Sequence, residues 1–231
     1  MDLGLYIAAS GMVAEQTRQD QLTNDLANTS TPGYKSDESS QHSFGEMLLS
    51  NTRSGQTIGA LNMGVQVGKT VTDMTPTGMQ DTGQALDFGI SGDGFFAVKT
   101  PQGTRYTRDG QFTASAQGQL VDQDGNQVLG QSGSPIKVEA DGRVAASALG
   151  VFNVPGAVKQ GANLFSGSAG GHATGTVRQG ALEESGVDAA RVMVDMIGAM
   201  RTYQSSQQAI QSIDQTLQEA STQVGSVNGA G

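Results

Sequence analysis

A heptad pattern of apolar residues near the C-terminal end constrains this chain more than any other feature. Read as a helix, residues 187–224 have a seam of positions at alternating intervals of three and four, interrupted by the polar residues Gln207, Asp214 and Ser221. Its apolar members are Met193, Met196, Met200, Tyr203, Ile210, Leu217 and Val224. This spacing is typical of a helix that packs against other helices. Ser185 and Asp188 resemble a capping box before this helix, and Gly225 is expected to end it.

The length of this predicted helix indicates that it needs partners. Roughly 38 residues extend about 57 Å at about 1.5 Å per residue, whereas a compact ball of 231 residues is about 45 Å across. No other long apolar helix is evident in the sequence to cover it. We therefore expect a helix that seeks partner helices, and a long core helix of a monomer is the alternative.

Residues 3–27 predict a second helix, which ends at Asn28 before the turn at Pro32-Gly33. Glu15 and Gln19 occupy the middle of its seam and weaken it. The apolar positions of that seam are Leu5, Ala8, Met12, Leu22 and Leu26. The economical interpretation is that the two helices pair with each other and with neighbouring copies, as a coiled-coil-like terminal domain.

Between Gly64 and about Gln179 the apolar period changes to two, which is typical of short β-strands. Asp124-Gly125 and Asp141-Gly142 mark hairpin turns. Residues 152–175 are expected to be loop-like, and residues 36–63 to form an extended arm with one apolar anchor, Phe44 with Met47–Leu49. The predicted fold class is α+β and elongated, with helical ends and a central β-rich domain.

Composition excludes several classes of function. The chain has no cysteine and two histidines, His42 and His172, outside any metal-ligand spacing, so we expect no metal and no cofactor. A net charge of −9 without a Lys/Arg cluster argues against nucleic acid. Neither a membrane-spanning run nor a secretory signal is evident. On these residues alone the protein is predicted to be cytoplasmic.

Two motifs that resemble ligand sites are better explained as turns. Gly92-x-Gly94-x-x-Ala97 matches the dinucleotide fingerprint, but a strand follows where that motif requires a helix. Asp122, Asp124 and Asn126 resemble a calcium loop without its required glycine and glutamate. No catalytic constellation is evident, although a carboxylate pair assembled by the fold stays open. The residues predict a self-assembling structural protein and no enzyme.

Several blocks, in order along the chain, resemble those of one known family. Residues 24–35 read N-D-L-A-N-T-S-T-P-G-Y-K, residues 90–98 I-S-G-D-G-F-F-A-V, and residues 106–112 Y-T-R-D-G-Q-F. Residues 161–165 read G-A-N-L-F, and residues 180–183 G-A-L-E, with M-I and R-x-Y following at 196–203. Together they resemble bacterial flagellar basal-body rod and hook proteins, most closely the distal-rod type or its Gram-positive homologues. Asp25 and Gly186 depart from asparagines of the family pattern.

The resemblance implies a subunit that self-assembles into a helical tubular shaft, which transmits torque and passes exported subunits. Its implied partners are other rod and hook proteins and the flagellar type III export apparatus, without nucleic acid or membrane insertion. Export without a cleaved signal peptide to the basal body, outside the cytoplasmic membrane, replaces the cytoplasmic prediction. The expected parts are residues 1–35 (helix and turn), 36–63 (arm), 64–180 (outer domain) and 181–231 (helix).

Two sets of candidate residues follow. The expected assembly interface comprises Leu5, Met12, Leu22, Leu26, Met193, Met196, Met200, Tyr203, Ile210 and Leu217. The family-motif residues are Asn28, Pro32, Gly33, Tyr34, Gly92, Gly94, Phe95, Phe96, Tyr106, Arg108 and Gly110. The alternatives are a hook or hook-junction subunit and a secreted module that binds or cuts cell-wall glycan, which would need paired carboxylates.

Overall fold

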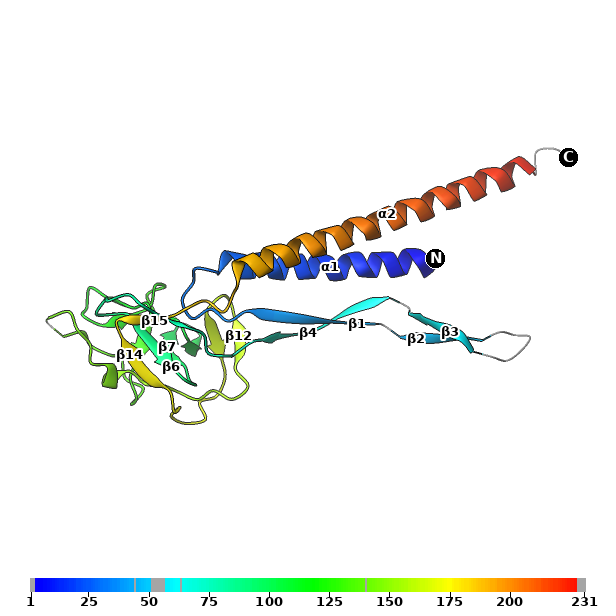
Figure 1. The fold of residues 1–231 in the computed structure, drawn as a ribbon. Helices are drawn as coiled ribbons and strands as arrows, with labels where there is room; N and C mark the ends of the chain where they lie inside the picture. The colour runs from blue at the N-terminus through cyan, green and yellow to red at the C-terminus, as the bar shows by residue number, and fades with distance from the viewer. Residues whose placement is uncertain (1–2, 44, 51–56, 63, 140, 228–231) are drawn as a thin grey trace. The chain divides into compact units, whose positions relative to one another are not determined.

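The computed structural model describes residues 3–43, 45–50, 57–62, 64–139 and 141–227 (Figure 1). They form an α+β fold with a helix at each end and strands between, as predicted. The chain folds into two compact units. The first unit takes its described residues from 1–24, 37–71 and 190–231, and the second from 25–36 and 72–189.

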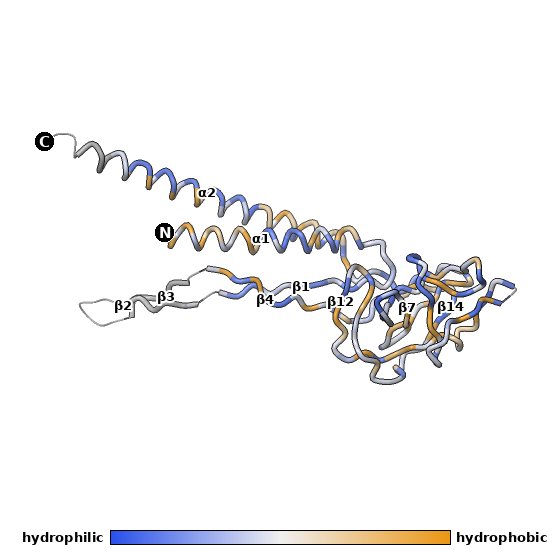
Figure 2. Tube along the Cα trace, turned by 180° about the vertical axis from the view of Figure 1, so that it is seen from behind, coloured by the Kyte–Doolittle hydropathy of each residue, from blue (hydrophilic) through white to orange (hydrophobic). Residues whose placement is uncertain are grey.

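Two antiparallel helices lie side by side in the first unit (Figures 1 and 2). They are α1 (Leu3–Ala27) and α2 (Ala189–Val227), which confirms both predicted helices. They approach closely at Gly11, where a Cβ would lie 3.7 Å from Ser206 Oγ. Figure 2 shows apolar residues along both helices and a more hydrophilic distal half of α2.

The ends of α2 differ from the sequence prediction. The helix begins at Ala189, so Asp188 directly precedes it and the predicted Ser185–Asp188 capping box is wrong. Ser185 Oγ instead donates a hydrogen bond to the carbonyl oxygen of Asn28, 2.9 Å away. Gly225 does not end the helix, which continues to Val227. A glycine inside a helix costs only about 1 kcal/mol, which neighbouring turns can offset.

Short strands pair in the remainder of the first unit. Strand β1 (Asp37–Ser43) pairs with β4 (Val65–Thr72), and β2 (Glu46–Ser50) pairs antiparallel with β3 (Thr57–Asn62). Gln21 Nε2 of α1 donates to the carbonyl of Asp37, and the Val65 amide donates to Ser10 Oγ over 3.2 Å. The expected anchor residue Phe44 lies outside the described residues, and Met47–Leu49 belong to β2.

A seven-stranded antiparallel sheet organises the second unit. Its spatial order is β12 (Val158–Gln160), β13 (Leu164–Ser166), β8 (Gly103–Thr107), β7 (Phe96–Thr100), β11 (Gln127–Leu129), β10 (Leu120–Val121) and β9 (Thr113–Ala114). Two further antiparallel pairs join β14 (Thr176–Gln179) to β6 (Phe88–Ser91) and β15 (Ala181–Glu183) to β5 (Met79–Asp81). A short 3₁₀ helix, η1, spans Ala146–Ala148.

The expectation of a loop at residues 152–175 is wrong in part. Strands β12 and β13 lie in this range, and β13 pairs with β8 so that Phe165 is opposite Tyr106. Strands of only three residues are too short to show the period of two that identifies longer strands. Their position is fixed by the partner strand, which single-sequence patterns do not reveal.

The predicted hairpin at Asp124-Gly125 is confirmed, since it joins the paired strands β10 and β11, whereas Asp141-Gly142 forms a turn without a named strand on either side. Asp122 Oδ1 accepts the amide of Asn126 over 2.7 Å, and Oδ2 accepts its side-chain amide over 2.9 Å. Both carboxylate oxygens therefore stabilise the turn between β10 and β11. At the second turn, the Arg143 amide donates to Asp141 Oδ1 over 3.1 Å.

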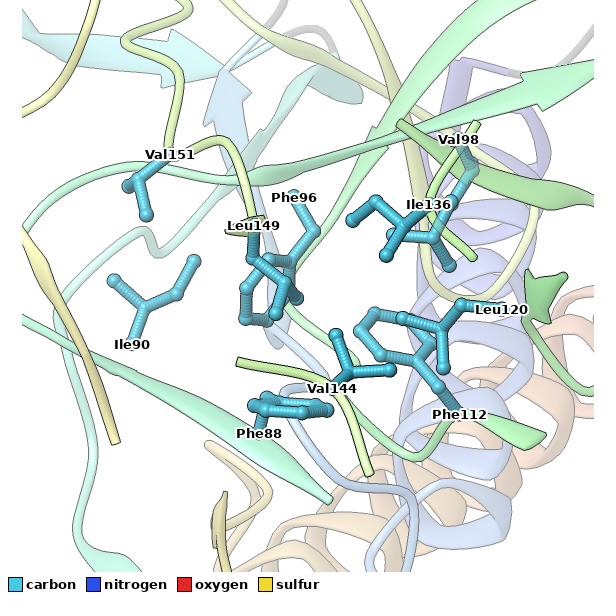
Figure 3. Packing of buried hydrophobic residues seen from close by; sticks show 11 residues of the cluster. Phe88, Ile90, Phe96, Val98, Phe112, Leu120, Ile136, Val144, Leu149 and Val151 are labelled. Atoms are coloured by element: carbon cyan, nitrogen blue, oxygen red, sulfur yellow. The ribbon is translucent and has the colours of Figure 1, made fainter. Parts of the chain in front are cut away.

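Two hydrophobic clusters form the core of the second unit. Phe96 is buried in the larger one, edge-on to Phe112 with 5.3 Å between ring centroids (Figure 3). Phe95 belongs to the smaller one, 5.2 Å from the ring of Phe165. Because side chains alternate along a strand, these neighbouring rings enter opposite sides of the sheet. Both phenylalanines are thus core residues, as the sequence predicted.

Replacing either ring should destabilise the second unit. We expect Phe96→Ala and Phe95→Ala each to lower the free energy of unfolding by about 3–5 kcal/mol, because each leaves a cavity. Chemical denaturation of the full chain measures this loss. Val158→Ala, at a side chain that is 59% exposed, is the control with a small effect. Unchanged unfolding of both Phe variants would contradict the core assignment.

Candidate functional site

The turn that follows α1 is fixed by a backbone that only glycine fits. Gly33 has φ 65°, and a Cβ there would lie 2.4 Å from the backbone carbonyl atoms of Arg108. The Gly33 amide donates to the carbonyl of Glu183 over 2.9 Å. A side chain at this position would push the turn away from the backbones of Arg108 and Glu183.

The buried side chain of Tyr34 connects the turn to the end of α1. Its hydroxyl donates to Asp25 Oδ1 over 2.8 Å, and both residues are buried. Lys159 Nζ lies 3.9 Å from the centre of the Tyr34 ring and donates to the carbonyl of Lys35 over 2.6 Å. The amide of Gly186 donates to the Tyr34 carbonyl over 2.8 Å. The residues before α2 are thereby bonded to the turn after α1.

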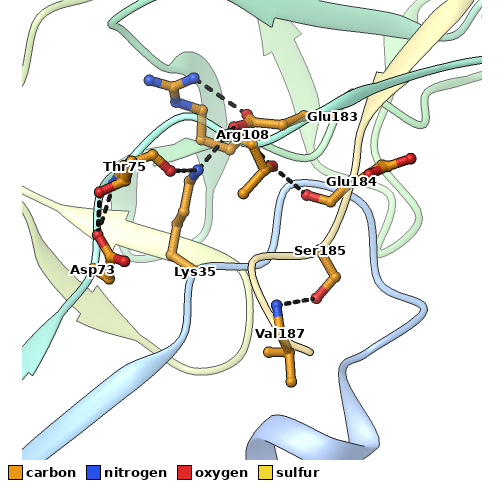
Figure 4. Close-up of polar contacts among 9 residues, drawn as sticks. Lys35, Asp73, Thr75, Arg108, Glu183, Glu184, Ser185 and Val187 are labelled. Atoms are coloured by element: carbon orange, nitrogen blue, oxygen red, sulfur yellow. Dashed lines mark hydrogen bonds and ion pairs between the residues drawn. The ribbon is translucent and has the colours of Figure 1, made fainter. Parts of the chain in front are cut away.

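A buried carboxylate lies between two buried cations beside this turn (Figure 4). Lys35 Nζ is 2.8 Å from Glu183 Oε1, and Arg108 Nη1 is 3.2 Å from Glu183 Oε2. None of the three side chains is more than 3% exposed. We call Lys35, Arg108 and Glu183 the ionic junction.

Further hydrogen bonds reach the Lys35 and Glu183 side chains of the junction. Lys35 Nζ also donates to the carbonyl of Thr75 over 2.6 Å, and Glu183 Oε1 accepts the amide of Thr77 over 3.0 Å. The Arg108 guanidinium lies 5.3 Å from the centre of the Phe95 ring. Its Nε makes no hydrogen bond within the described part of the chain. A buried cluster of charges such as the ionic junction is stable only when all its members are present.

Asp109 lies next to the junction in an unfavourable environment for its charge. Burial raises the pKa of Asp109 to about 6, and the negative charges of Asp122 and Asp87 act in the same direction. Hydrogen bonds from the Gln111 amide and from Asn163 Nδ2 oppose this rise in pKa. Asn163 Nδ2 also donates to the carbonyl of Pro32 over 3.3 Å, so it connects Asp109 to the turn.

The structure brings some of the family-motif residues to the junction. Gly33 lies against the backbone of Arg108, and the carbonyl of Pro32 accepts a hydrogen bond from Asn163. Tyr34 is bonded to Asp25, and Asn28 is bonded through its carbonyl to Ser185. Tyr106 and Phe95 lie in the smaller core cluster, and Phe96 in the larger one.

Glycines of the motifs mark close backbone contacts. A Cβ at Gly110 would lie 1.5 Å from the carbonyl oxygen of Phe88, and one at Gly94 would lie 2.3 Å from Val151. Gly92 has φ 99°, a conformation that favours glycine.

Two residues of the ionic junction, and several that bond to it or to the turn, were not among the candidates predicted from the sequence. Glu183, Lys35 and Asn163 stood in motif blocks, whereas Thr75, Thr77 and Lys159 carry no local signal. The one indication in the sequence that these positions matter was the presence of charged residues inside an otherwise apolar motif.

The predicted assembly seam of α2 is divided between two faces. Met196, Tyr203 and Ile210 are half-buried and share a face with Val192 and Ala199, which are buried. A second face is exposed, and we call its residues the α2 stripe: Met193, Val194, Ile197 and Met200, between 50% and 67% exposed.

The remaining seam candidates lie in mixed surroundings. Leu217 is 47% exposed. On α1, the candidates Leu5, Met12, Leu22 and Leu26 are half-buried. The side chain of Val224 lies outside the described residues.

Metal sites and membrane-spanning helices are both absent from the described ranges. No group of three or more His, Asp or Glu side chains there could hold a metal ion. Neither α1 nor α2 has the apolar run that a bilayer-spanning helix requires.

Three family models match separate segments of the chain. Residues 5–35 match "Flagella basal body rod protein", residues 89–154 match "Flagellar hook protein FlgE/F/G D1 domain", and residues 178–223 match "Flagellar basal body rod FlgEFG protein C-terminal". Each matched segment contributes one residue of the ionic junction: Lys35, Arg108 and Glu183.

Individual relatives align along nearly the whole chain. Identity is 34% to the flagellar basal-body rod protein FlgG of Bacillus subtilis, over 93% of this chain and 96% of that protein. It is 32% to FlgG of Borreliella burgdorferi, over 92% and 95%. The flagellar hook-basal body complex protein FlhO of Bacillus subtilis is 27% identical over 97% and 99%. The chain belongs to the flagellar basal-body rod protein family.

Membership of this family confirms the resemblance that the sequence motifs indicated. This rod protein has a structural role in the flagellar basal-body rod. The hook alternative fits no better, since the FlgG relatives are rod proteins.

Removing the central carboxylate should destabilise the rod protein strongly. Glu183→Gln leaves Lys35 and Arg108 buried without a counter-charge, and loss of one partner of a buried ion pair costs about 3–5 kcal/mol. Chemical denaturation measures this change. Glu184→Gln makes the same replacement at the exposed neighbour and should stay within about 0.5 kcal/mol. Equal unfolding free energies of the two variants would contradict a stabilising role for the junction.

Asp109 should make stability depend on pH. Its folded-state pKa of about 6 exceeds the ordinary value of about 3.9, so the folded state retains the proton longer. The free energy of unfolding should therefore fall by on the order of 2–3 kcal/mol as pH rises from about 4 through 6. Asp109→Asn should remove this fall, while Asp124→Asn, at an exposed turn residue, should keep it. A fall of the same size in Asp109→Asn would assign it to other groups.

Proposed function

We propose that this rod protein polymerises with its own copies into a helical tubular shaft through the exposed face of α2. The α2 stripe carries this proposal, because four neighbouring apolar side chains are at least half exposed. Full burial of such a side chain contributes about 1.5–3 kcal/mol. Burying the stripe against a neighbouring copy would therefore favour association. A heterologous contact repeated along a screw axis produces a filament.

The ionic junction supplies the second requirement of a shaft, which is a unit within the subunit that keeps its own structure under load. It bonds the turn after α1 and the segment before α2 to strands of the second unit. Both chain connections to the helices are thus held by one packed core. We propose that torque passes between the two chain ends through this junction.

The proposal extends to partners and location. We infer that the subunit contacts other rod and hook proteins, is exported by the flagellar type III apparatus and acts outside the cytoplasmic membrane. Near full-length similarity to the basal-body rod protein FlgG supports the proposed location in the rod. Relatives that are rod proteins support a structural role without catalysis.

A charge placed in the α2 stripe should prevent assembly without unfolding the subunit. Met200 is 50% exposed, so Met200→Asp should fold normally, whereas a carboxylate buried between helices of two copies is strongly unfavourable. We expect cells producing only this variant to lack complete rods in electron micrographs and to be non-motile.

Thr202→Asp is the matched control. Thr202 is exposed and lies about 200° around the helix from Met200, so this variant should restore motility. Rods of normal length in the Met200→Asp strain would contradict the proposed interface.

A further inference from the structure

Two buried polar atoms beside the ionic junction have no hydrogen-bond partner within the described residues. They are Nε of Arg108, which is a donor, and Oδ1 of Asn163, which is an acceptor. Neighbouring atoms of the same side chains are bonded: Arg108 Nη1 to Glu183, and Asn163 Nδ2 to Asp109 and Pro32. Burying either atom without a partner is unfavourable, because it has lost its hydrogen bonds to water.

The partners of the Asn163 amide fix its orientation. Its Nδ2 donates to Asp109 Oδ2 over 3.1 Å and to the Pro32 carbonyl over 3.3 Å. The reverse orientation would place an acceptor, Oδ1, against two other acceptors. The unpartnered Oδ1 therefore points away from Asp109 and Pro32.

The strand register makes Arg108 and Asn163 neighbours. Strands β8 and β13 are antiparallel, and Thr107 lies opposite Leu164 in their last pair. Arg108 and Asn163 are the next residue on each chain segment at that end of the pair. Side chains of opposite residues lie on the same face, with Cβ atoms about 4.5–5.5 Å apart. A donor and an acceptor without partners thus lie on neighbouring side chains and do not bond to each other.

We propose that one buried water molecule bridges Arg108 Nε and Asn163 Oδ1, accepting a hydrogen bond from the first and donating one to the second. Water suits a lone donor beside a lone acceptor, because its oxygen accepts while its protons donate. An ion does not suit this site. The Asn163 oxygen would repel an anion, and the Arg108 guanidinium would repel a cation.

This water completes a chain of hydrogen bonds through the second unit. The chain runs from the Glu183 carboxylate through Arg108, the water and Asn163 to the Pro32 carbonyl. It connects the ionic junction to the turn after α1 through side chains, in addition to the backbone contact at Gly33.

Nuclear Overhauser spectroscopy of the isotope-labelled full-length protein tests this, because it detects water close to the Arg108 Nε proton. We expect a cross-peak from that proton to water, with opposite signs in the laboratory-frame and rotating-frame spectra, as a bound water gives. Asn163→Leu is similar in size and has no acceptor, so it should lose this cross-peak. Asn153→Leu, the same replacement at an exposed asparagine, should keep it.

Absence of the cross-peak in the unchanged protein, or its persistence in Asn163→Leu, would overturn the proposal. If Asn163→Leu fails to fold, as judged by circular dichroism, a crystal structure of the unchanged full-length protein decides. One water within hydrogen-bond distance of both atoms supports the proposal. A direct bond between Arg108 Nε and Asn163 Oδ1, or another protein group bonded to either atom, overturns it.

Discussion

The rest of the structure depends on neutralising one buried carboxylate. Glu183 is 148 residues from Lys35 and 75 residues from Arg108 along the chain, yet it contacts both. A buried charge is tolerated only when its partners are present together. The turn after α1, the residue that follows β8, and β15 therefore reach their places as one cooperative event. Gly33 allows this approach, because its missing Cβ leaves room for the backbone of Arg108.

The two units obtain their order from different interactions. The second unit has two hydrophobic clusters, an extended sheet and the ionic junction, so its structure is fixed by interactions within one chain. The helices have a half-buried seam that contains Glu15 and Gln19, and an exposed apolar stripe. A subunit of the proposed shaft would benefit from this division. A rigid block preserves geometry under load, while helices that are not fully satisfied within one subunit gain from neighbouring copies.

Local patterns were sufficient for the regular elements. Heptad spacing predicted both helices, and Asp-Gly pairs predicted one hairpin and one further turn, because these signals arise between residues close in sequence. They failed at β12 and β13, which are strands only because β8 is beside them. They also failed at Ser185, whose hydroxyl bonds to Asn28 instead of capping α2. In each of these cases, an interaction with a residue or strand far away in the sequence determined the structure, and the local pattern did not.

The sequence by itself determined that this chain has two heptad helices around a β-rich centre and that its motifs are those of a rod protein. Periodicity and turn chemistry act over a few residues and are therefore readable without a structure. Only the tertiary structure decided which face of α2 is covered and which is exposed, and that Lys35, Arg108 and Glu183 form one cluster. Both facts depend on contacts between segments far apart in the chain. Each buried charge of the ionic junction is stable only beside its partners, and no local pattern specifies those partners.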